Sequence, residues 1–330
     1  MAILVTGGAG YIGSVAVDDL VDSGQRVVVL DDLSRGHLSS VNNEARFYQG
    51  DISDRTLVSR ICRENEITAA MHFSAFAYVG ESVDNPQLYY NNNTVKTIAL
   101  LDELLACEVR KIVFSSTCAV YGEPQSLPIT EDHPPKPENP YGWSKLFIEQ
   151  VLRDYGRSRG VRFVSLRYFN ACGATNRRRE LHDPETHLVP LVLDVAEGKR
   201  SHLTAFGDDH PTPDGTAIRD YIHVSDISRA HLLALDHLEG QGDSKFVNLG
   251  NGKGFSVLEV VEAARKVTGR HIEVVIGPRR LGDPSTLISD WSRARELFGW
   301  EPQIRSIEEM IASAWAGRQR HDTALAGNDG

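Results

Sequence analysis

The residues from Ala2 to Gly13 read AILVTGGAGYIG, and the architecture expected for the whole chain starts from them. Residues 2–6 predict a short apolar strand, and an apolar-periodic helix should follow the glycines. Gly8, Gly10 and Gly13 fit the pattern Gly-x-Gly-x-x-Gly, in which missing side chains permit a tight turn, a close approach to a pyrophosphate and close helix packing. Because the helix would begin directly after this loop, its N-terminus would face the anion. The order of strand, loop and helix therefore predicts a dinucleotide-binding site.

A second predicted strand, Arg26–Asp31, ends in an acid. The carboxylate of Asp31 can accept hydrogen bonds from the hydroxyl groups of an adenosine ribose and would repel a 2′-phosphate. Arg35 is the nearby residue that would favour that phosphate instead. On balance the acid predicts NAD, rather than NADP, as the cofactor.

Strands and helices alternate along the following part of the chain. Further strands are expected at residues 46–50, 69–75, 111–117 and 162–167, with helices between them, and a strand at 246–250 should return to the same sheet. Alternation of this kind gives an α/β fold with a parallel, doubly wound sheet, the Rossmann arrangement. The apolar stripes of the intervening helices are expected to form its core.

The alternation breaks after Asn170. A loop-rich region carries Arg177-Arg178-Arg179, for which a solvated loop is expected, and a helix follows through Leu188. Shorter strands are predicted at residues 204–207, 219–224 and 274–276. These elements should form a smaller C-terminal α/β lobe that binds the substrate.

The expected division of the chain has two parts. The NAD-binding Rossmann domain should comprise residues 1–170 and a returning segment at about 221–250. The smaller lobe should comprise residues 171–220 and 251–317, and residues 318–330 are expected to form a flexible tail. The substrate should lie between the two parts.

A tyrosine and a lysine four residues apart open a predicted helix. Tyr141 and Lys145 follow Pro140, a favourable residue at a helix start, and their spacing places them on one helical face. A neighbouring cation favours phenolate over phenol, which brings a tyrosine towards a working acid or base near neutral pH. This spacing alone is common on helix surfaces. However, the strand at 111–117 ends in Thr117, and ligands bind at the strand ends of an open α/β sheet. We therefore predict a catalytic set of Thr117, Tyr141 and Lys145.

Composition and charge argue against several classes of partner. The chain has 330 residues and a formal net charge of -10, which disfavours binding along a nucleic-acid backbone. The sequence contains no apolar run long enough to cross a bilayer, and Met1 leads into a strand without a signal core, so a cytoplasmic protein without membrane contact is expected. Cys62, Cys107, Cys118 and Cys172 are scattered without metal-ligand spacing, so reduced thiols and no metal site are expected.

Together these features resemble the extended short-chain dehydrogenase/reductase superfamily and, within it, the family of UDP-glucose 4-epimerases. The glycine loop and the Thr-Tyr-Lys set carry the first resemblance. The second rests on six further segments, namely His72-Phe73-Ser74-Ala75, Val79-Gly80-Glu81-Ser82, Arg167-Tyr168-Phe169-Asn170, Asp214-Gly215-Thr216, Arg219-Asp220-Tyr221-Ile222-His223-Val224 and Arg279-Arg280-Leu281-Gly282-Asp283. The resemblance extends from Ala2 to about Trp315.

The resemblance implies where the ligands bind. NAD is expected on Gly7, Gly10, Tyr11, Ile12, Gly13, Asp31, Asp51, Ile52, Phe73, Ala75, Asn92, Tyr141, Lys145 and Tyr168. A UDP-sugar is expected on Thr117, Tyr141, Asn170, Leu188, Thr204, Phe206, Arg219, Arg280 and Asp283. Two arginines suit a diphosphate because planar guanidinium groups bind its oxygens in pairs. Arg279 lies one residue out of register with Arg280, and the sequence leaves open which of the two contacts the diphosphate.

Some positions depart from the family pattern. Ala77 stands where a basic residue often contacts the pyrophosphate, and Val15 replaces a frequent histidine. Leu287 occupies a position that bears on whether the sugar pocket admits an N-acetyl group, and its intermediate size leaves that open. Cys118 and Ala119 stand where related dehydratases carry acids. Neither can transfer a proton as a carboxyl group would, so simple epimerisation is favoured over dehydration.

The function implied by the resemblance is reversible C4 epimerisation between UDP-galactose and UDP-glucose, through a 4-keto sugar and with tightly bound NAD. Alternatives are an NAD-dependent 4-epimerase acting on UDP-N-acetylhexosamines or UDP-pentoses, and a catalytically silent NAD-binding sensor. A homodimer built on the helices near 93–107 and 141–157 is also implied.

Overall fold

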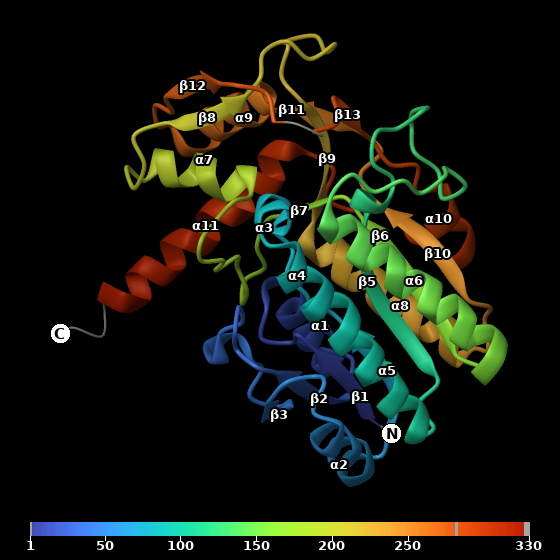
Figure 1. Cartoon of the computed structure of the whole chain (residues 1–330). Coiled ribbons are helices and arrows are strands. Elements are labelled where there is room, and N and C mark those ends of the chain that lie inside the picture. Colours follow the sequence, from blue (N-terminus) through green and yellow to red (C-terminus); the bar gives the residue numbers. More distant parts are fainter. Residues whose placement is uncertain (1, 281–282, 327–330) are drawn as a thin grey trace.

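The computed structural model describes residues 2–280 and 283–326, with side chains as far as Arg320. A large parallel sheet with helices on both faces forms one part of the molecule, and a smaller lobe of short strands and helices forms the other (Figure 1). The segment Leu281-Gly282 of the expected substrate motif lies outside the described residues.

The large sheet has the doubly wound order that alternation predicts. Within the described chain it contains seven parallel strands, in the spatial order β3 (Arg46–Gln49), β2 (Arg26–Asp31), β1 (Ala2–Thr6), β4 (Ile67–His72), β5 (Lys111–Thr117), β6 (Arg162–Tyr168) and β10 (Lys245–Leu249). The chain winds outward in one direction from β1 and in the other from β4. In sheets of this kind, ligands bind at the carboxyl ends of the strands where the winding direction changes.

Helices cover both faces of this sheet. One face holds α2 (Arg55–Asn65), α5 (Lys96–Ala106) and α6 (Pro140–Arg159). The other face holds α1 (Tyr11–Asp22), α8 (Val224–Glu239) and α10 (Ser292–Phe298). Shorter helices α3 (Val79–Asp84) and α4 (Pro86–Tyr89) lead through a π-helical turn at Tyr90–Val95 into α5, and 3-10 turns occupy Leu38–Ser40 and Cys118–Val120. The apolar stripes of the long helices form the core, as expected.

The smaller lobe consists of short strands and the helices packed on them. β9 (Ile218–His223) pairs with β7 (Asn170–Cys172), β11 (Gly254–Ser256) and β13 (Thr286–Leu287), and β8 (Leu203–Phe206) pairs with β12 (Val274–Gly277). α7 (Leu188–Ala196), α9 (Val257–Thr268) and α11 (Ile307–Ala326) share an apolar cluster. No helix within the described residues is both long enough and apolar enough to span a membrane.

Helix α11 continues into the segment for which a flexible tail is expected. Its Arg318 contacts the carboxylates of Asp194 at 2.6 Å and Glu197 at 2.9 Å, both at the end of α7. These contacts attach the helix to the smaller lobe at the residue where the tail should begin.

Helix α6 starts and ends at clear local signals. The side-chain oxygen of Asn139 accepts a hydrogen bond from the backbone N–H of Gly142 at 2.9 Å, and Pro140 occupies the first turn. Gly160, with a φ of +71°, ends the helix in the left-handed region. The start of α6 is therefore fixed beside the end of β5, which is the place where Tyr141 is needed.

A buried ion pair fastens α6 to the sheet. The carboxylate of Glu149 accepts hydrogen bonds from Arg167 of β6 at 2.9 Å and 2.6 Å, from Ser116 at 2.7 Å and from Ser165 at 2.9 Å. The third side-chain nitrogen of Arg167 donates to the Tyr121 hydroxyl at 2.9 Å. Both charged side chains are almost fully buried. Their pairing is necessary, because an isolated charge in this environment is costly.

Replacing Arg167 with methionine should lower the free energy of unfolding by about 3–5 kcal/mol, because Glu149 then stays buried without its partner. The double variant Glu149→Gln/Arg167→Met should recover part of this loss. Urea unfolding followed by tryptophan fluorescence measures both. Arg157→Met is the control, because Arg157 is exposed on α6, the helix that carries Glu149. It should change stability by less than about 0.5 kcal/mol. Equal losses in Arg157→Met and Arg167→Met would contradict the assignment.

Candidate active site

A cavity of about 370 Å³ opens at the carboxyl ends of the central strands. All of the residues expected to bind NAD line it, and so do Thr117, Asn170, Arg219 and Asp283 of the expected substrate set. Leu188, Thr204, Phe206 and Arg280 are not among the described residues that line it. The cavity thus unites the glycine loop at one end with the Thr-Tyr-Lys set at the other.

The glycine loop forms a cradle in which side chains do not fit. Gly7 has a φ of +73°, and a Cβ there would lie 2.5 Å from the backbone nitrogen of Ser74. A Cβ on Gly13 would collide with the backbone oxygen of Gly7. Helix α1 begins at Tyr11 without a side-chain cap or an acid in its first turn. These features leave the helix N-terminus open to a pyrophosphate, so the loop fits a dinucleotide.

Asp31 and Arg35 lie beside this cradle, and the protein binds their charges in different ways. The two carboxylate oxygens of Asp31 accept hydrogen bonds from the backbone N–H groups of Ala9 at 3.0 Å and Leu33 at 2.9 Å. Burial raises the pKa of Asp31. The guanidinium of Arg35 contacts Glu81 at 2.7 Å and lies over the rings of Phe76 and Tyr78. Its charge is therefore already paired within the protein.

Asp51 has a partner that the sequence did not suggest. Its carboxylate forms an ion pair with Lys96 of α5 and accepts hydrogen bonds from the backbone N–H of Ser53 at 2.8 Å and its hydroxyl at 2.7 Å. Lys96 also lines the cavity. The lysine was missed because it lies far along the chain from Asp51.

Tyr141, Thr117 and Lys145 lie together in the buried end of the cavity. Burial raises the pKa of the Tyr141 phenol well above its usual value, and the nearby Thr117 hydroxyl lowers it only in part. The ammonium of Lys145 donates to the backbone oxygen of Ser115 at 2.8 Å and lies 5.0 Å from the ring of Phe114. Burial lowers the pKa of Lys145 to about 7.

These directions differ from the simple expectation that Lys145 brings the pKa of Tyr141 down. The physical reason is the low polarity of the site, which disfavours both the phenolate and the ammonium. Lys145 is also partly supported by Glu149, whose charge raises the lysine's pKa. Glu149 was not predicted as part of the site, although its four-residue spacing from Lys145 on the same helix is a usable signal.

Two buried histidines pack near the cavity wall in their neutral forms. His231 stacks on Phe73 with ring centroids 4.5 Å apart, and its two ring nitrogens contact the Ser115 hydroxyl at 3.1 Å and the Ile227 backbone oxygen at 2.9 Å. Burial lowers its pKa to about 4. His72 of the expected His-Phe-Ser-Ala segment is likewise buried, and burial lowers its pKa to about 3. Neither imidazole carries charge near neutral pH.

The expected substrate residues form two groups. Arg219 forms an ion pair with Asp283 at the cavity wall, next to Leu287. Arg280 lies over the ring of Phe206, with its guanidinium carbon 3.7 Å from the ring centroid. Burial lowers the pKa of Arg280, and the charge of Arg219 lowers it further while Asp283 opposes this. The two arginines are therefore close enough to affect each other.

Leu188 and Thr204 lie in the smaller lobe, outside the described lining of the cavity. Leu188 is the first residue of α7 and packs against the apolar cluster of the smaller lobe. Thr204 lies on β8, opposite Val275 of β12.

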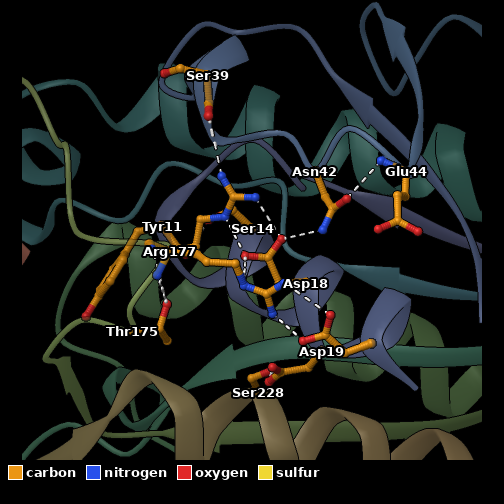
Figure 2. Close-up of polar contacts among 12 residues, drawn as sticks. Tyr11, Ser14, Asp18, Asp19, Ser39, Asn42, Glu44, Thr175, Arg177 and Ser228 are labelled. Atoms are coloured by element: carbon orange, nitrogen blue, oxygen red, sulfur yellow. Dashed lines mark hydrogen bonds and ion pairs between the residues drawn. The ribbon is translucent and has the colours of Figure 1, made fainter. Parts of the chain in front are cut away.

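The loop between β7 and α7 crosses from the smaller lobe to α1, and its arginines are not simply solvated. Arg178 contacts both carboxylate oxygens of Asp18 at 2.6 Å and 2.7 Å, and Arg177 forms an ion pair with Asp22. Figure 2 shows Arg177 against Asp18 and Asn42 reaching the same carboxylate. The expected solvated loop is wrong at Arg178, because its aspartate partner is buried on α1. The arginines instead anchor this loop beside the cavity.

Comparison with known proteins agrees with this arrangement. The model of the NAD dependent epimerase/dehydratase family matches residues 3–250. A UDP-glucose 4-epimerase of Halalkalibacterium halodurans is 50% identical over 323 residues, which cover 97% of this chain and 96% of the relative. A UDP-glucose 4-epimerase of Streptococcus mutans is 50% identical over 320 residues, which cover 96% of each chain.

Solved structures share the fold of this chain over nearly its whole length. The structure of UDP-glucose 4-epimerase from Brucella ovis in complex with NAD has a TM-score of 0.93 at 44% identity, and the match covers 96% of this chain and 98% of the other. The structure of UDP-glucose 4-epimerase from Bifidobacterium longum in complex with NAD+ and UDP has a TM-score of 0.92 at 38% identity, covering 98% and 99%. With a glycine cradle at one end of the cavity and a buried tyrosine at the other, this chain belongs to the NAD dependent epimerase/dehydratase family.

Proposed function

We propose that the protein interconverts UDP-galactose and UDP-glucose by reversible inversion at C4, with NAD as a tightly held cofactor. The observation that carries this proposal is the single cavity that joins the glycine cradle to the buried Thr117, Tyr141 and Lys145. The two relatives described above, both named UDP-glucose 4-epimerase and of nearly the same length as this chain, support it.

The residues of the cradle would hold the cofactor by its pyrophosphate, and Tyr168 and Lys145 line the part of the cavity nearest to Tyr141. When bound, NAD supplies a ring that accepts a hydride from C4 and returns it, so that the sugar passes through a 4-ketone and its configuration at C4 can invert. Asp31 would accept hydrogen bonds from the adenosine ribose. Since Arg35 is paired with Glu81, the protein offers no free cation there for a 2′-phosphate, within the residues that the structure describes.

Tyr141 would carry the proton of the C4 hydroxyl. Its phenol is buried in the wall of the cavity near the Thr117 hydroxyl, so the proton would move directly or through that hydroxyl. Burial keeps the phenol protonated in the protein alone, and a positive charge placed beside it favours the phenolate. Lys145 would supply part of that charge and hold the ring of Tyr141 in place from the next turn of the helix.

The smaller lobe would hold the UDP group. Arg219 and Arg280 suit the diphosphate, and the charge of one affects the pKa of the other, which favours Arg280 over Arg279 as the second contact. Anchoring the nucleotide while the sugar stays free to turn is what inversion through a planar ketone requires. We accordingly assign NAD binding to residues 1–170 with the segment at about 221–250, and substrate binding to the smaller lobe.

Two observations bear on the alternatives. Leu287 lines the cavity and is buried, so the size of this side chain limits the space beside the sugar, and N-acetylated UDP-sugars and UDP-pentoses remain substrates to test. Burial raises the pKa of Cys118 to about 12, which makes its thiol a poor proton donor for the elimination of water by a dehydratase.

We also propose a homodimer. Large apolar side chains are exposed along the helices α3 to α6, namely Val79, Val83, Leu88, Val95, Trp143 and Phe147. The rings of Trp143 and Phe147 lie 5.6 Å apart, and Tyr90 lies 6.0 Å from Phe147. Exposed apolar side chains of this kind, with the rings of Tyr90, Trp143 and Phe147 in contact, favour a protein interface. This apolar face includes the ends of the two helices for which dimer contacts are expected.

Replacing Tyr141 with phenylalanine should reduce turnover of UDP-galactose about 100- to 10,000-fold, because the proton carrier is lost while the ring remains. A coupled assay for UDP-glucose measures turnover, and chromatography of the nucleotide released by denaturation measures retained NAD, which should be unchanged. Tyr155→Phe on the same helix is the matched control, since its hydroxyl contacts Asp102 outside the cavity. Wild-type turnover in Tyr141→Phe would sink the mechanism and favour a sensor.

The buried lysine should make stability depend on pH in the cofactor-free protein. The pKa of Lys145 is lowered from 10.5 to about 7, so between these values the unfolded chain binds a proton that the folded protein has lost. Its contribution to the free energy of unfolding therefore rises with pH across this window, by at most about 1.4 kcal/mol per pH unit, and is fully unfavourable below it.

Lys145→Met should remove this slope, which the difference in urea unfolding free energy between wild type and variant measures at several pH values. Lys136→Met, at an exposed position, is the control. A difference between wild type and Lys145→Met that does not change from pH 7 to pH 10 would contradict the lowered pKa.

Phe147→Glu should convert the dimer into a monomer, because it places a charge in the apolar face. Sedimentation velocity measures the oligomeric state. Val275→Glu is the control, since Val275 is similarly exposed but lies on β12 in the smaller lobe. Dissociation by Val275→Glu, with Phe147→Glu still dimeric, would place the interface elsewhere.

A further inference from the structure

Two Glu-x-His pairs meet in the loop between β7 and α7. Glu180 and His182 form the first pair, Glu185 and His187 form the second, and two residues separate them in the sequence. The four side chains each direct one ligand atom toward a common region, and these atoms all lie within 4.8 Å of one another. The cysteines, on which the expectation of no metal site rested, play no part in this cluster.

The distances within the cluster suit a shared cation. One carboxylate oxygen of Glu180 lies 2.8 Å from Nδ1 of His182 and 2.9 Å from Nδ1 of His187, and an oxygen of Glu185 lies 2.9 Å from the same nitrogen of His187. Four ligand atoms arranged tetrahedrally about 2 Å from one ion would be about 3.3 Å apart. The observed separations, from 2.8 Å to at most 4.8 Å, lie around this value, so small side-chain movements would complete the arrangement.

One imidazole lies between the two acids of this cluster: burial lowers the pKa of His187, but hydrogen bonds to Glu180 and Glu185 outweigh this and raise it to about 10. Nδ1 of His187 can carry one proton, yet it faces two carboxylates, and the Glu180 side chain is only 9% exposed. Two acids held this close in a partly buried place repel each other unless positive charge lies between them. A dication in the common region would supply that charge to both.

An unpartnered hydroxyl beside the cluster is an independent observation. Tyr78 is 6% exposed, and its hydroxyl is buried without a hydrogen-bond partner among the described residues. Its ring lies edge-on to His182 and His187, with centroids 5.7 Å and 6.1 Å away, and the charges of Glu185 and Glu180 reach its phenol. A buried polar group without a partner is rare and often marks a water or an ion. A water bound to an ion in the cluster would give this hydroxyl its partner.

We propose that Glu180, His182, Glu185 and His187 bind a divalent transition-metal ion, with Zn²⁺ the best match. Two imidazole nitrogens with two carboxylate oxygens are typical Zn²⁺ ligands, whereas Mg²⁺ and Ca²⁺ prefer oxygen ligands throughout. The site has a structural role rather than a part in the sugar chemistry, because the Thr117-Tyr141-Lys145 set needs no metal for proton transfer.

The position of the cluster gives this ion a consequence for the cofactor. Glu180, His182 and His187 line the cavity, and His182 lies edge-on to Tyr11 at the start of α1, with ring centroids 6.3 Å apart. Arg178 already ties the beginning of the same loop to Asp18. The ion would fasten the other end of the loop and so hold the wall of the cavity in place beside the glycine cradle.

Equilibrium dialysis of the chelator-treated, NAD-loaded protein against Zn²⁺, with metal analysis, tests the proposal. We expect about one Zn²⁺ per chain, and Co²⁺ in its place should give the visible absorption of a four-coordinate site. His187→Gln keeps a hydrogen-bond donor for the two acids but removes the imidazole, and it should weaken Zn²⁺ binding at least about 100-fold. Glu180→Gln removes a carboxylate ligand and should also weaken Zn²⁺ binding at least about 100-fold. His271→Gln is the matched control, because His271 forms an exposed pair with Glu273, and it should bind Zn²⁺ as the wild type does.

A second measurement does not depend on the variants. Adding Zn²⁺ to the metal-free wild type should raise the temperature of thermal unfolding and slow the loss of bound NAD during dialysis, and both effects should be absent in His187→Gln. Failure of the wild type to bind Zn²⁺ at micromolar concentration, or equal binding by His187→Gln and wild type, would overturn the proposal and leave the cluster as a set of hydrogen-bonded ion pairs. Epimerase activity is not a readout here, so a wrong functional proposal would not affect the result.

Discussion

The ion pair between Glu149 and Arg167 is the interaction on which the geometry of the site depends. It joins the middle of α6 to β6, and its arginine is also held by Tyr121, whose hydroxyl in turn donates to Asn248 of β10 at 2.6 Å. Lys145 lies one turn and Tyr141 two turns before Glu149 on the same helical face. Fixing the helix at Glu149 therefore fixes where the phenol and the ammonium stand relative to the end of β5.

The same burial that fixes these groups also sets their chemistry. A phenol and an ammonium placed in a dry site both tend toward their neutral forms, and the pKa values of Tyr141 and Lys145 shift in the directions that this predicts. In the protein alone both side chains are therefore held near their neutral forms. Their protonation changes strongly when a charge is brought beside them. Such a response suits a proton carrier that should act only when cofactor and sugar are both in place.

Local patterns explain which features could be predicted from the sequence. The glycine loop, the alternation of strands and helices and the start of α6 follow from periodicity, glycine spacing and helix caps, all of which act over a few residues. The pairing of Arg178 with Asp18 joins residues 160 positions apart, and no local pattern indicates it. The direction of the pKa shift at Lys145 depends on burial, which spacing does not reveal. β9 was expected as a strand, but its membership of the four-stranded sheet depends on partners from three distant segments.

Asp220 on β9 links the two parts of the molecule. Burial raises its pKa to about 6, and its carboxylate nevertheless accepts hydrogen bonds from the backbone N–H groups of Asn251 and Gly252, just after β10 of the large sheet, and from Ser289, after β13. A rigid-body rotation of one lobe away from the other would break these hydrogen bonds and leave the Asp220 carboxylate without the partners that hold it among the described residues. Substrate and product would then enter and leave through movements of surface loops rather than through a hinge between the lobes. Each catalytic cycle would rearrange the entrance of the cavity while the two lobes keep their relative position.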